Sequence, residues 1–244
     1  MRFSFFSIFI FLFGSQNAQI SFNDVIVSPK KIEFISVYDS TYGIVCYNNL
    51  VSAIAGDSVR YDANGHKVQG WIEDQYTSGT TLHKGYYIDG KIRVFKNFYP
   101  DGKLERSFKL NDAKRSEMII FYSNEKIKSK MLYFGETITH QEDFYENGIK
   151  EYEEEFDKSG LILWRKVSFR PDGSSENSLE VIDKKRKKYL QQEFYSGGII
   201  KCSGEMKLNM ETYDFLKDGK WNYYDEKGNL IKSENYNKGE LFVE

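Results

Sequence analysis

The stretch Phe144-Tyr-Glu-Asn-Gly148 contains the unit from which the fold can be predicted: an aromatic residue, three further residues and a glycine. The unit recurs along the chain, usually with Asp or Asn before the glycine. Such dipeptides between alternating apolar residues are typical of tight β-hairpin turns, because these turns need a positive φ that glycine adopts without strain. We therefore predict turns at the glycines of these units and of one weaker Ser-Gly signal: Gly65, Gly79, Gly90, Gly102, Gly148, Gly160, Gly173, Gly198, Gly219 and Gly228.

The spacing of the units predicts how the hairpins follow one another. Gly90 and Gly102 lie 12 residues apart, while Gly102, Glu125 and Gly148 are separated by 23 residues each. Glu125 stands in a degenerate copy that lacks the glycine. A step of about 12 residues holds one strand and one turn, so a 23-residue repeat is a hairpin. We predict an all-β fold in which stacked hairpin repeats over residues 61–244 form an elongated antiparallel β-meander, a single twisted sheet.

Composition and alternation agree with this prediction. Aromatic residues make up 16% of the 244 residues, against only five alanines, which argues against a largely helical protein. Side chains alternate between the faces of a strand. Arg106 and Phe108 should share one face and Glu105 the other, and Glu153 should lie opposite Tyr152. We expect one apolar, aromatic face and one charged, solvated face.

Two stretches resemble a known repeat. The first is Gly219-Lys-Trp-Asn-Tyr-Tyr-Asp-Glu-Lys-Gly228, continuing to Gly239, and the second runs from Gly70-Trp71 to Lys91. Both resemble the variant MORN repeat, and the resemblance covers roughly residues 61–244. It implies hairpins stacked side by side into an elongated sheet. Bacterial members of that family are frequently labelled antitoxin-like, and many similar proteins carry export signals.

The N-terminus has the features of a secretory signal peptide. Arg2 is followed by an apolar run over Phe3–Phe13 and then by a small-residue exit at Ala18. The run is too short to span a bilayer, which takes about 20 residues. We predict a signal peptide over residues 1–18, cleavage near Ala18 and an exported protein that is periplasmic, surface-bound or secreted. The alternative is a buried N-terminal strand or helix. Residues 19–60 are interpreted as an N-terminal β cap.

Charge and cysteines limit the class of partner. The formal net charge is -2, so the basic footprint of a nucleic-acid-binding protein is missing, and we predict no nucleic acid partner. Cys46 and Cys202 could form a disulfide in an exported protein. The alternative, which we favour, is two unpaired thiols packed as small hydrophobes, because Cys202 is in register with Ile200 and Met206.

No reactive constellation emerges from the remaining residues. His66, His83 and His140 are too scattered for a metal cluster and are expected to be solvated. No catalytic or phosphate-binding motif is present, so we predict no enzyme, no metal and no cofactor. The basic run 184–188 could contact anionic lipid or polysaccharide, or it could be a solvated turn.

The three tryptophans are the remaining candidates. Trp71, Trp164 and Trp221 could form a binding surface, or they could pack between neighbouring repeats. Long repeat sheets offer extended binding faces. We therefore expect an exported, non-enzymatic scaffold that binds an unknown protein partner. The alternatives are a module that binds a glycan or lipid surface, and an antitoxin-like or immunity-like partner protein.

Overall fold

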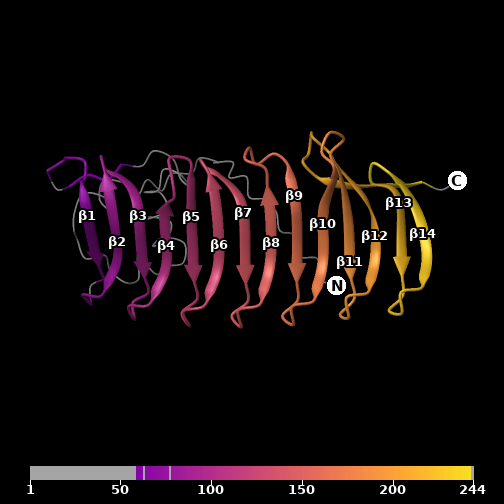
Figure 1. Ribbon diagram of the computed structural model, residues 1–244, viewed down its shortest axis with the longest axis horizontal. Coiled ribbons are helices and arrows are strands. Elements are labelled where there is room, and N and C mark those ends of the chain that lie inside the picture. Colours follow the sequence, from indigo (N-terminus) through magenta and orange to yellow (C-terminus); the bar gives the residue numbers. More distant parts are fainter. Residues whose placement is uncertain (1–58, 63, 77, 243–244) are drawn as a thin grey trace, which may run out of the picture.

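The computed structural model describes residues 59–62, 64–76 and 78–242, which form one open sheet of 15 antiparallel strands. Each strand pairs with its neighbours in sequence, from β1 at one end to β15 at the other (Figure 1). The predicted all-β meander of hairpins is confirmed. The predicted signal peptide, most of the N-terminal cap and Cys46 lie outside the described residues. The strands are β1 (Gly70–Gln75), β2 (Thr81–Ile88), β3 (Lys91–Phe98), β4 (Leu104–Leu110), β5 (Arg115–Phe121), β6 (Ile127–Phe134), β7 (Thr137–Phe144), β8 (Lys150–Phe156), β9 (Leu163–Phe169), β10 (Ser175–Asp183), β11 (Lys188–Phe194), β12 (Ile200–Leu208), β13 (Phe215–Tyr224), β14 (Leu230–Asn237) and β15 (Glu240–Phe242).

The aromatic-to-glycine turns gather along one long edge of the sheet, at the bottom of Figure 1, where each odd-numbered strand turns into the next. Six predicted glycines lie in these turns with positive φ: Gly79, Gly102, Gly148, Gly173, Gly198 and Gly228. Glu125 takes the same conformation, with φ of 67°, in the copy that lacks glycine. Gly90 and Gly160 lie in turns of the opposite edge, and Gly65 lies in a turn before β1.

The prediction of a turn at Gly219 is wrong. Gly219 lies inside β13, where the pairing with β12 shifts register between Gly204 and Glu205. Its φ is 69°, so it carries the positive φ of a β-bulge. The chain reverses earlier, between β12 and β13, where Tyr213 has φ of 60°. A bulge and a hairpin turn both need this conformation, and the Asp-Gly dipeptide does not distinguish them.

Bulges also recur beside the turns. The register shifts between Asn97 and Phe98, and the equivalent shift recurs beside the turns that follow β5, β7 and β11. Glu105 is the residue left unpaired on β4, and it is only 5% exposed. The predicted solvated position of Glu105 is therefore wrong, because a bulge interrupts the alternation of side chains between the two faces.

One face of the sheet, termed the core face, carries most of the buried apolar residues. Its first cluster, over β2–β6, centres on Phe95, Phe108 and Met118, which are direct cross-strand partners. Its second cluster, over β9–β14, contains Tyr189 and Trp221. The predicted apolar, aromatic face is therefore present as two separate clusters.

A polar belt separates the two clusters on β7 and β8. Gln141 donates to Asp143 at 2.8 Å, the Ser129 hydroxyl donates to Asp143 at 2.5 Å, and the Tyr152 hydroxyl donates to Glu154. Asp143 and Tyr152 are direct cross-strand partners, as are Gln141 and Glu154. Both faces of the sheet are therefore polar at its middle, and little apolar surface is buried there.

A row of tyrosines joins neighbouring hairpins along the lower edge. In this hydroxyl row, the tyrosine three residues before a turn's positive-φ residue donates to the main-chain oxygen at the start of the next turn on that edge. The Tyr99 hydroxyl donates to Phe121 at 2.7 Å, and the Tyr122 hydroxyl donates to Phe144 at 2.7 Å. The same bond is made by Tyr76, Tyr145 and Tyr195. Arg170 replaces tyrosine at one position and donates to the Phe194 oxygen through its guanidinium.

Candidate functional site

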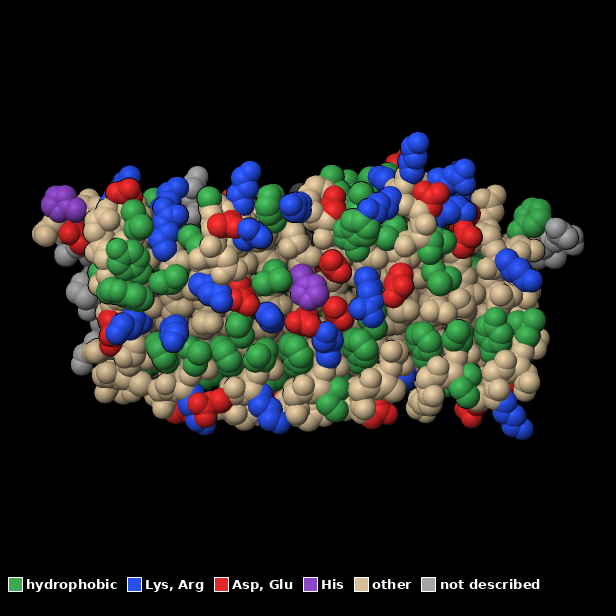
Figure 2. Space-filling model, in the orientation of Figure 1, with side chains coloured by type: hydrophobic (Ala, Val, Ile, Leu, Met, Phe, Trp, Pro, Cys, Tyr) green, Lys and Arg blue, Asp and Glu red, His purple; other side chains and the backbone are tan. Residues whose placement is uncertain are grey.

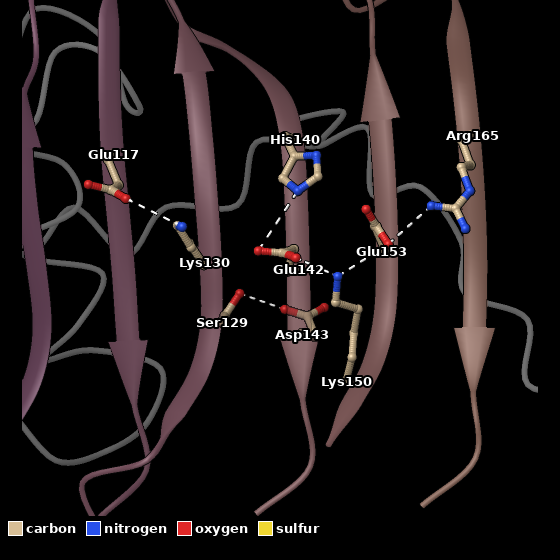
Figure 3. A network of polar contacts seen from close by, with 9 residues as sticks. All are labelled: Glu117, Ser129, Lys130, His140, Glu142, Asp143, Lys150, Glu153 and Arg165. Atoms are coloured by element: carbon tan, nitrogen blue, oxygen red, sulfur yellow. Dashed lines mark hydrogen bonds and ion pairs between the residues drawn. The ribbon is translucent and has the colours of Figure 1, made fainter. Parts of the chain in front are cut away.

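The opposite face, termed the network face, carries charged side chains on every strand from β5 to β10 (Figure 2). Acidic and basic groups alternate across the strands. Glu142 on β7 is hydrogen-bonded to Lys150 on β8 at 2.5 Å, and Lys150 lies 3.3 Å from Glu153. Glu153 in turn pairs with Arg165 on β9 at 3.3 Å (Figure 3). The result is a chain of ion pairs that runs perpendicular to the strands.

Because these ion pairs are partly buried, each contributes more to stability than a fully exposed ion pair does. The Glu142 and Glu153 side chains are 19% and 16% exposed. Burial alone would raise the pKa of Glu142, but the hydrogen bond and the charge of Lys150 lower it. Burial alone would likewise lower the pKa of Lys150, and its two carboxylate partners raise it. Each group therefore holds its neighbour in the charged form.

The same network contains a potential ligand set for a cation. Atoms of His140, Glu142 and Glu153 lie within 4.8 Å of one another. Sequence reasoning did not bring this group together, because it treated the histidines and the acidic run over residues 151–155, a solvated strand face or a cation site, separately. The signal was a histidine two residues from a glutamate, beside an acidic strand. However, the Lys150 ammonium already lies against both carboxylates. A metal ion would have to displace it, so we assign no metal to the cluster.

A groove of about 500 Å³ opens at the β1 end of the network face. Its apolar lining includes Trp71, Val94 and Ile119. Trp71 is 60% exposed and its indole packs edge-on against Tyr86, with ring centroids 5.4 Å apart. Three lysines, Lys84, Lys96 and Lys109, line the groove together with one carboxylate, that of Glu117. An exposed aromatic residue among apolar and cationic side chains is typical of a binding surface.

The lysines of the groove differ in how far they are neutralised. Lys84 lies 3.6 Å from Glu73, and Lys109 lies 2.7 Å from Glu117. Within the part of the chain that the structure describes, Lys96 has no ion pair, and its side chain is exposed. The groove therefore keeps a net positive character beside its apolar floor.

The prediction that His83 is solvated is wrong, since it is fully buried under the first apolar cluster. Its Nδ1 donates to the Asn97 side-chain oxygen at 2.7 Å, and Nε2 accepts from the Tyr87 hydroxyl at 2.9 Å. Burial lowers the pKa of His83 to about 4. The buried ion pair of Arg60 with Asp74, at 2.6 Å, completes this group. Every ring nitrogen has a partner, so His83 is a structural residue; by contrast His66 is exposed and His140 is half-buried.

The other predicted binding residues are held within the protein. Trp221 is 1% exposed in the second apolar cluster, and half-buried Trp164 lies under the Lys184 ammonium. Lys188, at the end of the basic run, pairs with Glu205 at 2.5 Å. Cys202 is a free, buried thiol. Of the three tryptophans, only Trp71 presents a large exposed surface.

The comparisons give no family. No family model matches the chain, and no curated protein matches it. A crystal structure of a mutant of S. aureus TarM, in complex with Fondaparinux, alpha-GlcNAc-glycerol and UDP, is 12% identical, with a TM-score of 0.30, over 51% of this chain and 21% of that one. A second crystal structure of TarM is 13% identical, with a TM-score of 0.28, over 45% and 19%. The chain spans about a fifth of the length of these proteins. In the described residues, no helix is long and apolar enough to cross a membrane.

Proposed function

We propose that the protein is a non-enzymatic scaffold that binds another protein through the β1 end of its network face. The observation that carries the proposal is Trp71, 60% exposed beside a groove of about 500 Å³. Tryptophan is enriched among the residues that dominate protein–protein affinity. A cluster of three lysines beside it favours a partner segment that carries acidic residues next to an apolar anchor.

The test places a photo-crosslinking amino acid at Lys96, inside the groove, and as a matched control at Lys207, exposed on β12 of the same face. We expect an adduct with a single partner from Lys96, none from Lys207, and loss of the Lys96 adduct when Trp71 is replaced by alanine. Adducts that form equally at both positions, or that persist in Trp71→Ala, would contradict the proposal.

The alternative for this groove is a glycan. The exposed Trp71 indole would stack on a sugar ring, and Lys96 would attract an acidic substituent. Saturable binding to an acidic glycan on an array, lost in Trp71→Ala and in Lys96→Gln, would favour this function over protein binding. Binding to a lipid surface and an antitoxin-like role are two further proposals. Vesicle binding tests the first, and a toxin reading frame beside the gene tests the second.

The compartment and the family are proposals too. We infer export from the N-terminal pattern that ends near Ala18. Cell fractionation, with the N-terminal residue of the mature protein identified by mass spectrometry, tests this. Relationship to the variant MORN repeats is supported by the hairpin array and by the two matching stretches. Hairpin arrays with those same turn and tryptophan positions in homologues would strengthen it.

A further inference from the structure

The C-terminal part of the core face contains an aromatic cage. Trp221 and Tyr223 on β13 and Tyr236 on β14 surround the ammonium of Lys217, whose Nζ lies 4.3 Å, 5.4 Å and 4.8 Å from the three ring centroids. Trp221 and Tyr236 are at 73° to each other, so the rings form walls rather than a stack. Faces of aromatic rings attract cations through their quadrupole, and three rings around one ammonium is the arrangement that recognises quaternary ammonium groups.

The cage is held rigidly. Gly204 on β12 faces the indole of Trp221, and a side chain there would come within 2.3 Å of the ring. The Trp221 indole N–H donates to the main-chain oxygen of Glu205 at 2.9 Å. While Trp221 is buried, Tyr223, Tyr236 and Lys217 are each partly exposed. Solvent therefore reaches one side of the cage, and a ligand could enter without unfolding the strands.

Beside the cage lie one carboxylate, which favours the positive end of a zwitterionic ligand, and one ammonium, which favours its negative end. The Glu234 carboxylate accepts from the Tyr236 hydroxyl at 2.8 Å and favours a cation nearby. Lys232 lies next to it, over the ring of Tyr223 at 4.6 Å. Its ammonium, 2.7 Å from Glu234, is exposed and offers a cationic contact at the edge of the cage.

We propose that this cage binds a phosphocholine group. The quaternary ammonium takes the place of the Lys217 ammonium among the three rings, and the phosphate lies toward Lys232. Lys217, which sits on a flexible stem and donates to the Tyr223 hydroxyl at 2.9 Å, acts as the resident cation that the ligand displaces. Lys217 competes with the ligand for the cage. The apparent affinity of the protein therefore equals the affinity of the open cage multiplied by the fraction of molecules in which the cage is open. This site lies far along the sheet from the Trp71 groove, and its test does not depend on the proposed function.

The experiment titrates the full chain with choline, with phosphocholine and, as a control for charge alone, with ammonium chloride. The readouts are calorimetry and the NMR signal of the Trp221 indole N–H, assigned in a variant with Trp71 and Trp164 replaced by phenylalanine. We expect saturable binding of both choline compounds by the wild type and none of ammonium. Lys217→Ala should bind about tenfold tighter, and Tyr236→Leu at least about tenfold more weakly.

Lys232→Gln tests the phosphate contact. It should remove the advantage of phosphocholine over choline while leaving choline binding in place. Vesicles of phosphatidylcholine, against vesicles of phosphatidylglycerol, then separate a lipid source from the free compound. Binding by Lys217→Ala but not by the wild type would overturn the proposal, because the cage would then be closed by its own lysine. Absence of binding in both proteins, with circular dichroism showing an intact sheet, would overturn it as well.

Discussion

Replacing the tyrosines of the hydroxyl row by phenylalanine should loosen the array without disturbing its packing. The change in Tyr122→Phe removes only the hydroxyl that donates to the Phe144 main-chain oxygen at 2.7 Å. The ring stays, and so does the hairpin that contains it. The natural substitution of Arg170 at one position of the row, where a guanidinium donates to the equivalent oxygen, indicates that the donor matters more than the side chain that supplies it.

The size of the effect follows from the contact. A net hydrogen bond stabilises a protein by about 1 kcal/mol. The Phe144 oxygen belongs to a half-buried residue, so water can partly replace the lost hydroxyl. The loss of stability should therefore be about 1 kcal/mol, and not the larger penalty of a fully buried oxygen without a partner. Equivalent positions lie two strands apart, about 10 Å, which is far enough for effects to add. The triple variant of Tyr99, Tyr122 and Tyr145 should therefore lose about 3 kcal/mol.

Urea unfolding followed by circular dichroism measures this. With a slope of about 3 kcal/mol per molar urea, the single change should lower the midpoint by about 0.3 M and the triple change by about 1 M. Tyr213→Phe is the control, because that tyrosine is 54% exposed and its hydroxyl makes no hydrogen bond in the described residues. A triple variant with the midpoint of the control would refute the reasoning.

Three further changes follow from buried groups. Burial lowers the pKa of His83 to about 4, so between pH 7 and pH 4 the unfolded chain binds a proton that the folded protein does not, and stability should fall over this range by up to about 3 kcal/mol. Urea midpoints should depend less on pH in His83→Gln than in the wild type, and an equal dependence would count against this. Gly204→Ala should cost about 3 kcal/mol, because the new methyl meets Trp221, whereas Gly197→Ala, with open space around it, should be neutral by the same urea assay. Burial raises the pKa of Cys202 to about 11, so a variant with this single cysteine should react with a thiol reagent at about pH 8 only after urea is added, and rapid labelling in the native state would show that the thiol is accessible.

The regular spacing of the hairpin turns could be predicted from sequence because each turn depends on local chemistry. Asn-Gly or Asp-Gly at the end of a strand encodes the positive φ, and Gly148 or Gly102 needs no distant residue to adopt it. The alternation of faces follows wherever the ladder is regular, as for Tyr152 and Glu153. Gly219 shows the limit of the same rule: its local signature equals that of a turn, and only the pairing of β12 with β13 makes it a bulge.

What sequence reasoning missed depends on contacts between strands. His83 is buried because Tyr87 and Asn97 satisfy its ring nitrogens, and Asn97 lies on a neighbouring strand. The network of Glu142, Lys150 and Glu153 requires the register of β7 against β8, which shifts at the bulge beside the turn. A pattern of charges on one strand does not show which opposite charge lies beside it on the next.

The hydroxyl row has a consequence for the length of the molecule. Each tyrosine of the row reaches the next turn along its edge, and each strand of the described sheet pairs with its neighbours in sequence, so a hairpin is joined to the hairpins beside it. Duplication of a 23-residue segment between Gly102 and Glu125 would give the added copy a donor for the following turn and an acceptor for the preceding one. Genetic expansion or contraction of the array could therefore change how far it reaches, hairpin by hairpin, without a new fold having to evolve.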